Sequence, residues 1–463
     1  MQCTLRSIFL FLCGVSFCLM SSAVEPAPHP RFGGQLRHAI FQRVTTLDGV
    51  NYLNFAESQV AANLYEGLVK RDRFGRIVSA IAQSWRHSED YRVWRFTIAQ
   101  NAKFHDGTPV RAIDIKRAWE RSVRESWRGE IERESRMSLF SIEGAVSYRT
   151  NATEEIIGIE VLDEKHLRVT LKKGDPEFLA KLTAPMAWIT KQGNPQPIGT
   201  GRFHVASYSA EEIQLAANAN YVWGRPYVDS VIFRYYVDVR EALFDFESRG
   251  LDALYLPLTE AEKRRRENLN EILIQTDIAT GVYLYINLPN TKSQDSGQQA
   301  WHNFLKYAVD VDALLRLQYG AEFAQLALAA SPYRYNPTKA RRRLKHTNEE
   351  RSRSLRMVYA SLPDNTGEEI AMRLKRDFFS HVGLQVANPV EFRGALKDAS
   401  ADIALLAMRL PQDTDGAPSN LYKSDFLIPL YFLPSHFLCQ PQVRCINIGW
   451  GGIATFDGVW LSQ

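Results

Sequence analysis

The chain has 463 residues, of which 45% are hydrophobic and 23% charged, and its formal net charge at pH 7 is +4. This is the composition of an ordinary globular protein with enough apolar residues for more than one buried core. The small net charge does not favour nucleic-acid binding. No apolar run beyond residue 20 is long enough to span a membrane.

The first 23 residues have the three parts of a secretory signal peptide. Residues 1–6 are short and basic, residues 7–20 are apolar, and Ser21-Ser22-Ala23 ends the segment in small side chains. The apolar part is shorter than the ~20 residues that a membrane span needs, although an uncleaved anchor is the alternative. We therefore expect cleavage after Ala23 and export of the mature protein.

Further along the chain, hydrophobic periodicity alternates between strands and helices. It predicts strands at 34–40, 93–98, 231–236, 283–287, 354–360 and 384–389, and a hairpin at 159–171. Helices are predicted at 58–69, 112–123, 301–319 and 368–382, and a turn at 104–108. This alternation favours an α/β fold.

Two runs of basic residues, 263–266 and 341–343, lie in stretches with a helical pattern. Solvated helix faces explain these runs better than a nucleic-acid site. Export through the membrane also argues against a nucleic-acid partner, so none is expected.

Three of the five cysteines lie in the signal peptide, which leaves Cys439 and Cys445 in the mature chain. Two cysteines close together in an oxidising compartment predict a disulfide that closes a short loop. A pair of buried free thiols is the alternative. No Cys-x-x-Cys or zinc-ligand spacing is present, and we expect neither a metal site nor a cofactor.

The motifs of the common enzyme classes are absent from the sequence. It has no Gly-x-Ser-x-Gly elbow, no His-Glu-x-x-His, no phosphate-binding loop and no dinucleotide fingerprint. We therefore assign no catalytic residue and do not expect an enzyme. The aromatic residues suit core packing and, in smaller number, the lining of a binding cleft.

A series of short motifs runs along the mature chain. They lie at residues 47–48, 61–68, 82–85, 94–98, 104–110, 112–114, 197–201, 218–221, 224–227, 285–287, 307–310 and 428–431. In this order and spacing the series resembles the family 5 extracellular solute-binding proteins, the oligopeptide- and dipeptide-binding components of bacterial ABC importers. Many of these motifs have structural roles, such as the tight turn at Asp106-Gly107.

The resemblance implies the two-lobed periplasmic-binding-protein type II fold, an α/β architecture that closes on its ligand about a hinge, with an extra subdomain on lobe I. The implied boundaries are 24–69, 191–278 and 440–463 for lobe I, 70–190 for the subdomain and 279–439 for lobe II. Two departures are visible. Gly49 stands where the family usually has proline, and the segment between residues 409–416 and 426–431 is short, so lobe II is expected to be shortened.

The function that the resemblance implies is peptide transport. A monomer in the periplasm would capture a peptide, or a related small solute, and deliver it to the membrane permease of an ABC importer. The same fold with haem, a nickel chelate or an antimicrobial peptide as ligand is an alternative. So is a degenerate or regulatory member without a transport role, which the shortened lobe favours. A secreted hydrolase is a third possibility, disfavoured by the missing catalytic motifs.

The resemblance also implies ligand contacts. The strand residues Thr280, Gly281, Val282 and Tyr283 correspond to a strand that binds peptide backbone by strand addition, and Glu57 corresponds to a lobe I contact. Ordinary sheet or surface is the alternative for each of them.

The acidic partner of a peptide α-amino group has no clean match. Asp413 is the nearest candidate in lobe II and Asp415 the next. Phe246 and Phe392 match cleft aromatics less well, and core packing is the better interpretation of both.

Overall fold

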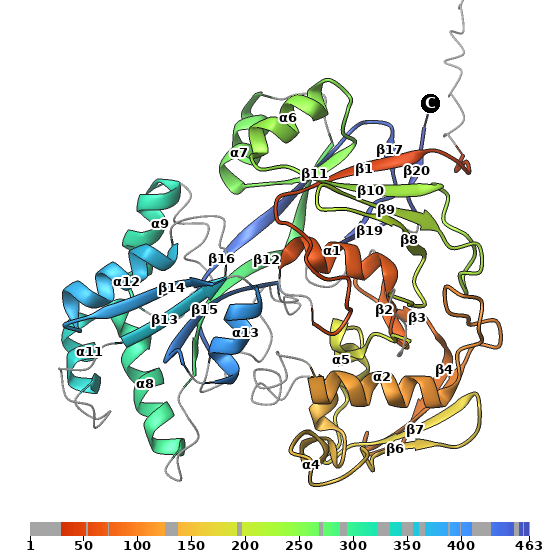
Figure 1. Cartoon of the computed structure of the whole chain (residues 1–463), viewed down its shortest axis with the longest axis horizontal. Helices are drawn as coiled ribbons and strands as arrows, with labels where there is room; N and C mark the ends of the chain where they lie inside the picture. The colour runs from red at the N-terminus through yellow and green to blue at the C-terminus, as the bar shows by residue number, and fades with distance from the viewer. Residues whose placement is uncertain are drawn as a thin grey trace, which may run out of the picture.

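The structure, a computed structural model, describes residues 29–462 except 52–53, 73, 126–137, 192–196, 268–271, 288–293, 322–333, 345–354, 361–365, 388, 399, 410–426, 449–452 and 457. It has two bodies joined by long strands (Figure 1). We call the body with β1 and β8–β11 lobe I, and the body with β13–β15 lobe II. The signal peptide expected at 1–23 lies outside the described residues.

One ten-stranded sheet runs through both lobes, in the order β14-β13-β15-β12-β16-β11-β1-β10-β9-β8. The lobe I strands are β1 (Gln35–Ile40), β8 (Phe203–Tyr208), β9 (Glu212–Ala217), β10 (Ser230–Tyr235) and β11 (Ala253–Leu256). The lobe II strands are β13 (Leu355–Ala360), β14 (Val382–Ala387) and β15 (Ile403–Arg409). In lobe I β1 is parallel to β10 and β11, and in lobe II β13 is parallel to β14 and β15. The predicted α/β fold is confirmed.

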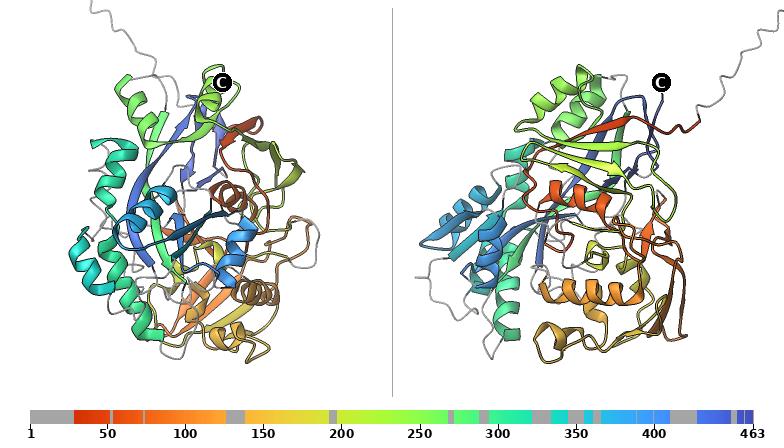
Figure 2. Two further views of the ribbon diagram at one scale, coloured as in Figure 1. Left: turned by 60° about the vertical axis from the view of Figure 1, so that its left-hand side comes forward. Right: turned by 45° about the vertical axis from the view of Figure 1, so that its right-hand side comes forward.

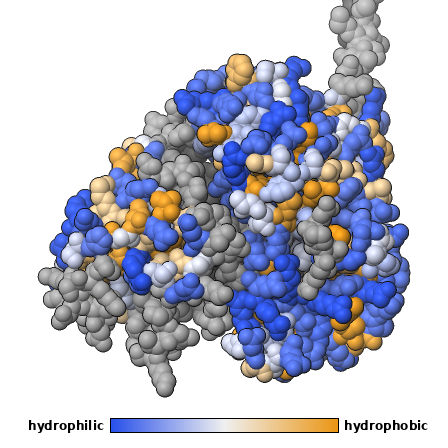
Figure 3. Space-filling view, viewed as in Figure 1, coloured by the Kyte–Doolittle hydropathy of each residue, from blue (hydrophilic) through white to orange (hydrophobic). Residues whose placement is uncertain are grey.

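The helices pack on this sheet around separate apolar cores. Lobe I has α1 (Phe55–Leu64), α6 (Val239–Glu247) and α7 (Leu258–Glu267), and lobe II has α8 (Gln294–Ala308), α9 (Val311–Tyr319), α11 (Pro337–Leu344), α12 (Thr366–Asp377) and α13 (Pro389–Lys397). Figure 2 shows α8, α9 and α11 standing together on one side of lobe II. The face in Figure 3 is mainly hydrophilic, and its apolar residues form small separate groups. No helix in the described part of the chain has the length and apolar character to cross a membrane.

A smaller unit lies below lobe I in Figure 1. Its four-stranded antiparallel sheet has the order β4 (Ala82–His87), β5 (Val93–Ile98), β7 (His166–Thr170), β6 (Ile159–Val161). The predicted helix 112–123 is α2 (Ala112–Glu125), and it buries Ile115, Ala118, Trp119 and Ser122 as its pattern indicates. Trp119 donates a hydrogen bond from Nε1 to the carbonyl oxygen of Ala187 (3.0 Å), so its one polar atom is satisfied in the core.

Short elements complete the chain. They are β2 (Val69–Arg71), β3 (Ile77–Ser79), α4 (Ala145–Arg149), α5 (Phe178–Lys181), β17 (Val443–Arg444), β18 (Asn447–Ile448), β19 (Ala454–Thr455) and β20 (Trp460–Leu461), with the 3-10 turns Ser138–Ser141 and Pro185–Ala187. β2 pairs with β3, β17 with β20 and β18 with β19.

The two lobes are connected by β12 (Ile272–Ile286) and β16 (Leu427–Cys439), which pair along their length. The pairing is regular from Ile272 to Gln275, beside the lobe I strand β11. It resumes at Ala279, beside the lobe II strand β15, and its register shifts again between Val282 and Tyr283. Between Gln275 and Ala279 the register shifts. Such an irregularity bends a strand and interrupts its ladder. The sheet is therefore interrupted where it passes from one lobe to the other.

The helix predicted over residues 301–319 is wrong in one respect, because the structure divides it into α8 and α9. Asp310 accounts for the break. Its carboxylate accepts a hydrogen bond from the amide of Ala313 (3.1 Å) and so caps the start of α9.

The predicted disulfide between Cys439 and Cys445 is also wrong for this structure, in which both are free thiols. Cys439 ends β16 between β11 and β12, and its buried thiol lies 3.7 Å from the carbonyl oxygen of Ile272. Cys445 is exposed and has a positive φ of 61°. One side chain is thus enclosed by the sheet and the other is in solvent. Burial raises the pKa of the Cys439 thiol to about 12.

Candidate functional site

The loop at residues 41–54 is the first candidate for a wall of a ligand site. It leaves the carboxyl end of β1, a strand with a parallel neighbour on each side, and leads into α1. In open α/β sheets ligands bind at the carboxyl ends of the strands. The first residue of α1, Phe55, packs edge-on against Tyr255 of β11, next to the strands that connect the lobes. The loop therefore lies at the side of lobe I where the two lobes are joined.

Glu57 fixes the shape of this loop. Its Oε1 accepts hydrogen bonds from the amide and hydroxyl of Thr45 (2.9 and 2.7 Å) and from the amide of Thr46 (3.3 Å). Its Oε2 accepts from the amide of Asn54 (3.3 Å), which in turn caps α1 through its side chain. A carboxylate has about four acceptor positions. Four of the protein's own donors contact this carboxylate, three at Oε1 and one at Oε2, so Glu57 positions the loop.

Two tyrosines and an ion pair hold the same loop from other sides. The hydroxyl of Tyr65 donates to the carbonyl of residue 47 (2.7 Å), and that of Tyr208 donates to the carbonyl of residue 44 (2.8 Å). Arg121 of α2 pairs with both carboxylate oxygens of Asp48 (3.1 and 2.7 Å). The wall is thus fixed by α1, by the edge of the lobe I sheet and by the smaller unit.

The packing around Gly49 accounts for the glycine that stands where the family usually has proline. A Cβ atom at this position would lie 2.8 Å from the ring of Tyr65 and 3.1 Å from the side chain of Thr190. A proline would need those neighbours to shift. The glycine therefore allows Tyr65 to reach the loop.

Two of the sequence motifs, 61–68 and 218–221, and the residue that follows a third, Arg202, meet in one buried network. Arg202 donates to Oε1 of Glu66 (2.6 Å), and the two side chains are 4% and 3% exposed. The hydroxyl of Tyr221 donates to the same oxygen (2.6 Å), and Lys70 lies 3.3 Å from it. A buried charge is tolerated only with such partners. Segments that lie far apart in sequence are held together by this network at the end of α1.

His105 connects the turn at 104–108 to the glycine motif at 197–201. Its Nδ1 accepts from the amide of Gly199 (3.2 Å), and its Nε2 lies 3.2 Å from the carbonyl oxygen of Gly201. One acceptor and one donor nitrogen describe a neutral ring. Burial favours the same state and lowers the pKa of His105 to about 4. A Cβ at Gly199 would lie 2.2 Å from the carbonyl oxygen of Leu64. Only glycine therefore lets the chain at residue 199 pass so close to the backbone of Leu64.

In lobe II, the predicted contact strand lies inside the sheet. Thr280, Gly281, Val282 and Tyr283 pair with β15 on one edge and β16 on the other. An interior strand has no free backbone edge to which a peptide strand could add. Val282 and Tyr283 are 3% and 1% exposed. A Cβ at Gly281 would lie 2.5 Å from the Tyr283 ring, which gives the glycine a packing role.

The remaining predicted residues divide into two groups. Asp413 and Asp415 lie outside the described residues, in the segment between the end of β15 at Arg409 and the start of β16. Phe246 and Phe392 are 1% and 2% exposed, in agreement with core packing.

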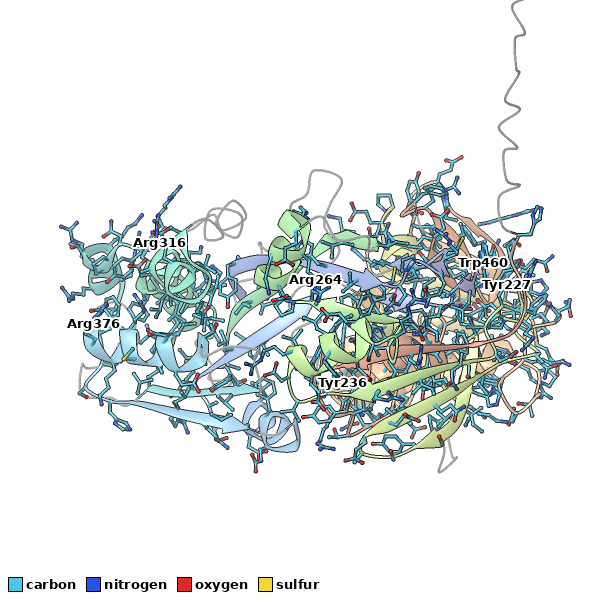
Figure 4. All side chains as sticks on the ribbon, turned by 90° about the horizontal axis from the view of Figure 1, so that it is seen from above. Tyr227, Tyr236, Arg264, Arg316, Arg376 and Trp460 are labelled. Carbon is cyan, nitrogen blue, oxygen red and sulfur yellow. The ribbon has the colours of Figure 1, made fainter. Side chains whose placement is uncertain are left out.

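An open pocket of about 420 Å³ lies at the edge of lobe I. It is lined by Glu211, Glu212, Arg234, Tyr235, Tyr236, Glu241, Phe244 and Asp245; Tyr236 is labelled in Figure 4. Arg43 of the loop 41–54 pairs with Glu211 (3.1 Å), so the pocket adjoins that loop. No sequence motif indicates this pocket, because its residues come from separate strands and a helix.

Arg234 pairs with Glu212 and Asp245 (3.4 and 3.2 Å). It is the one cation of a lining that has four acidic side chains, so the pocket is acidic. Among the described residues, no group of three or more His, Cys, Asp or Glu side chains is placed to hold a metal ion.

Comparison with known proteins assigns the family. The family model described as bacterial extracellular solute-binding proteins, family 5, middle region, matches residues 76–407. The chain is a member of this family. Family 5 consists of solute-binding proteins, in agreement with the expectation that the chain is not an enzyme.

Two relatives illustrate the range of the family. The nickel-binding periplasmic protein of Escherichia coli K12 is 26% identical over 318 residues, which are 62% of this chain and 55% of that protein. The oligopeptide-binding protein AppA of Bacillus subtilis is 23% identical over 380 residues, 79% of this chain and 66% of AppA. The chain thus spans about half to two-thirds of the length of these curated relatives.

The fold agrees with the family. The murein tripeptide binding protein MppA of Escherichia coli superposes with a TM-score of 0.71 and 17% identity, covering 93% of this chain and 98% of MppA. This family 5 protein therefore has the two-lobed fold of the periplasmic binding proteins.

Proposed function

We propose that this family 5 protein captures a peptide, or a peptide-like solute, between its two lobes in the periplasm and delivers it to the permease of an ABC importer. The observation that carries the proposal is the family match over residues 76–407 together with a two-lobed fold that extends over 93% of the chain. Affinity would come from burial of the ligand between the lobes, without any chemical step.

The register shift in β12 and β16 supports a closing motion. Hinges consist of a few residues that absorb large changes in φ and ψ. Residues between Gln275 and Ala279 interrupt the ladder that would otherwise stiffen the connection. We assign the hinge to this point, which agrees with boundaries at residues 278 and 279 between lobe I (24–69, 191–278, 440–463) and a shortened lobe II (279–439), with 70–190 as the subdomain.

The rigid loop 41–54 would form the lobe I wall. Its backbone is already fixed by Glu57, Tyr65 and Tyr208 before any ligand is present. A wall fixed in advance lowers the entropy lost on binding. On the lobe II side, β15 ends at Arg409, opposite Thr280.

The charge that meets a peptide α-amino group is proposed to come from Asp413 or Asp415. A buried ammonium group requires an acidic partner. The third candidate, Glu57, is less favoured for this role because its carboxylate accepts four hydrogen bonds from residues 45, 46 and 54. Cleavage of the leader after Ala23 and function as a monomer belong to the same proposal.

Calorimetry with trialanine and N-acetyl-trialanine tests this proposal. Asp413→Asn or Asp415→Asn, whichever is the true partner, should weaken binding of the free peptide by about 2–5 kcal/mol. It should leave the acetylated peptide unchanged, because that peptide has no charge there. Glu57→Gln is the comparison variant: any loss of affinity through a loosened loop 41–54 should be the same for the free and the acetylated peptide. Unchanged binding in both aspartate variants would contradict the proposed amine site.

A nickel complex is a second candidate ligand. The relative that favours it is the nickel-binding periplasmic protein, 26% identical to this chain. Calorimetry with nickel and histidine added together distinguishes this candidate from peptide capture. Heat of binding with the complex and none with peptides would replace the first proposal.

A further inference from the structure

Positive charge is concentrated in one segment that solute capture does not use. Residues 334–343 include five basic residues and no acidic residue, whereas the whole chain has 56 basic and 52 acidic residues. The rest of the chain therefore has 51 basic residues against 52 acidic ones. The excess of positive charge of this protein thus lies in ten consecutive residues.

Four of these five basic residues lie on the exposed side of one helix, α11. In α11, Ala340 and Leu344 are buried, whereas Lys339, Arg341, Arg342 and Arg343 are exposed. An α-helix makes one turn in every 3.6 residues, so these four cations are spread around the exposed side of α11. Because the four cations point in different directions, they do not converge on a single anion.

Neighbouring helices extend this face. Lys339 donates to the hydroxyl of Tyr307 on α8 (2.8 Å), and Arg341 donates to the carbonyl oxygen of Asp377 at the end of α12 (3.3 Å). Arg376 on α12 is 61% exposed, and Figure 4 shows it at the end of lobe II that is far from lobe I. We call this group the basic end of lobe II: Lys306, Lys339, Arg341, Arg342, Arg343 and Arg376.

Few acidic groups neutralise the basic end. Asp377 pairs with Arg376 (2.7 Å), but no described carboxylate lies within ion-pair distance of Arg342 or Arg343. The positive charge of this group also affects the phenol of Tyr307. Its pKa is lowered by the hydrogen bond from Lys339 and by the charges of Lys339, Lys306 and Arg343.

We propose that the basic end of lobe II docks this protein on a membrane surface of anionic phospholipid. Guanidinium groups pair with phosphate in two-pronged geometry, and clustered basic residues are attracted to anionic headgroups. Cations spread over a convex helix match an extended plane of charge. The inference shares with the proposed function only the export of the chain, and it is independent of the captured ligand.

Co-sedimentation of the mature protein with lipid vesicles tests this proposal. The protein should bind vesicles of phosphatidylcholine mixed with phosphatidylglycerol at low salt, and should not bind phosphatidylcholine alone. Raising the salt concentration should release it. The double variant Arg342→Glu/Arg343→Glu should lower the partition coefficient on the order of thirty-fold or more.

The control is Lys172→Glu/Lys173→Glu, which changes the net charge equally at two exposed cations after β7. It should bind the anionic vesicles as wild type does. Circular dichroism verifies that both variants are folded. The proposal is overturned if wild type ignores anionic vesicles, if the two double variants lose binding equally, or if Arg342→Glu/Arg343→Glu binds unchanged. Binding to permease-containing vesicles that lack anionic lipid would also overturn it, in favour of an acidic protein surface.

Discussion

The two lobes are stabilised by different means. Lobe I buries charged groups, notably Glu66 with Arg202, and Glu57 beneath the loop 41–54. The core of lobe II is formed by apolar side chains of β12–β16 and of the helices α8, α9, α11 and α12. In the described part of lobe II no ion pair has both side chains buried. Buried polar groups with fixed partners specify one backbone geometry, so lobe I has a prepared wall, whereas lobe II depends on packing.

The largest effect should come from breaking the buried pair of lobe I. Arg202→Met leaves Glu66 buried with one partner fewer, and we expect a loss of about 3–5 kcal/mol in the free energy of unfolding. Urea denaturation measures it. The double variant Arg202→Met/Glu66→Leu removes both charges and should recover much of the loss. A single variant as stable as wild type would mean that the pair does not hold these segments together.

A pH dependence should come next. Burial lowers the pKa values of His38 and His105 to about 4, below the ordinary value of 6.5. Between these values the unfolded chain binds more protons than the folded one. Stability from these residues is therefore fully present above pH 6.5 and is lost as the pH falls toward 4, by up to about 3 kcal/mol for each histidine.

The measurement is the free energy of unfolding as a function of pH in wild type and in His105→Asn. Between pH 6.5 and 4, the free energy of unfolding of the variant should fall less steeply with decreasing pH, because one histidine fewer takes up a proton on unfolding. Equal slopes would show that His105 titrates alike in the folded and unfolded chain.

A smaller effect is expected at Glu57. Glu57→Gln brings an amide group toward amide donors that need an acceptor, so we expect a loss of about 1–3 kcal/mol in stability. Thermal unfolding measures this loss. A variant with full stability but altered discrimination between free and acetylated peptides would give Glu57 the role of a ligand contact after all.

The thiols should differ in reactivity without any cost in stability. Cys445 is exposed, whereas Cys439 is buried and its thiol has a raised pKa. Ellman's reagent should modify one thiol in the folded, unreduced protein and two after unfolding. If the unfolded, unreduced protein had no reactive thiol, the two cysteines would be joined in a disulfide, and the structure would be contradicted.

Several parts of the fold could be predicted from the sequence because their signals are local. The alternation of apolar residues at 93–98 gives β5 with its bounds, and the buried face of α2 follows from its 3.6-residue spacing. The break at Asp310 was missed because both helices continue one apolar pattern. α1 begins three residues before its predicted start, because the capping box of Asn54 and Glu57 sets it.

The candidate site was less predictable, for a physical reason. The resemblance suggests that Glu57 matters but cannot show that its acceptors are already occupied by residues 45, 46 and 54. Similarly, the sequence of a strand at 280–283 does not show whether the strand lies at the edge of a sheet or inside it. Its neighbours β15 and β16 come from more than 100 residues further along the chain, and only the tertiary structure brings them together.

Native mass spectrometry tests the central claim of solute capture most directly. The mature protein, purified from the periplasm without denaturation, should carry extra mass that is lost after unfolding and refolding. Fragmentation of the released molecule should identify it as a peptide or a peptide-like solute, and the refolded protein should regain mass when mixed with short peptides. A protein that has the mass of the bare chain from residue 24 and acquires no mass from peptides would contradict the account.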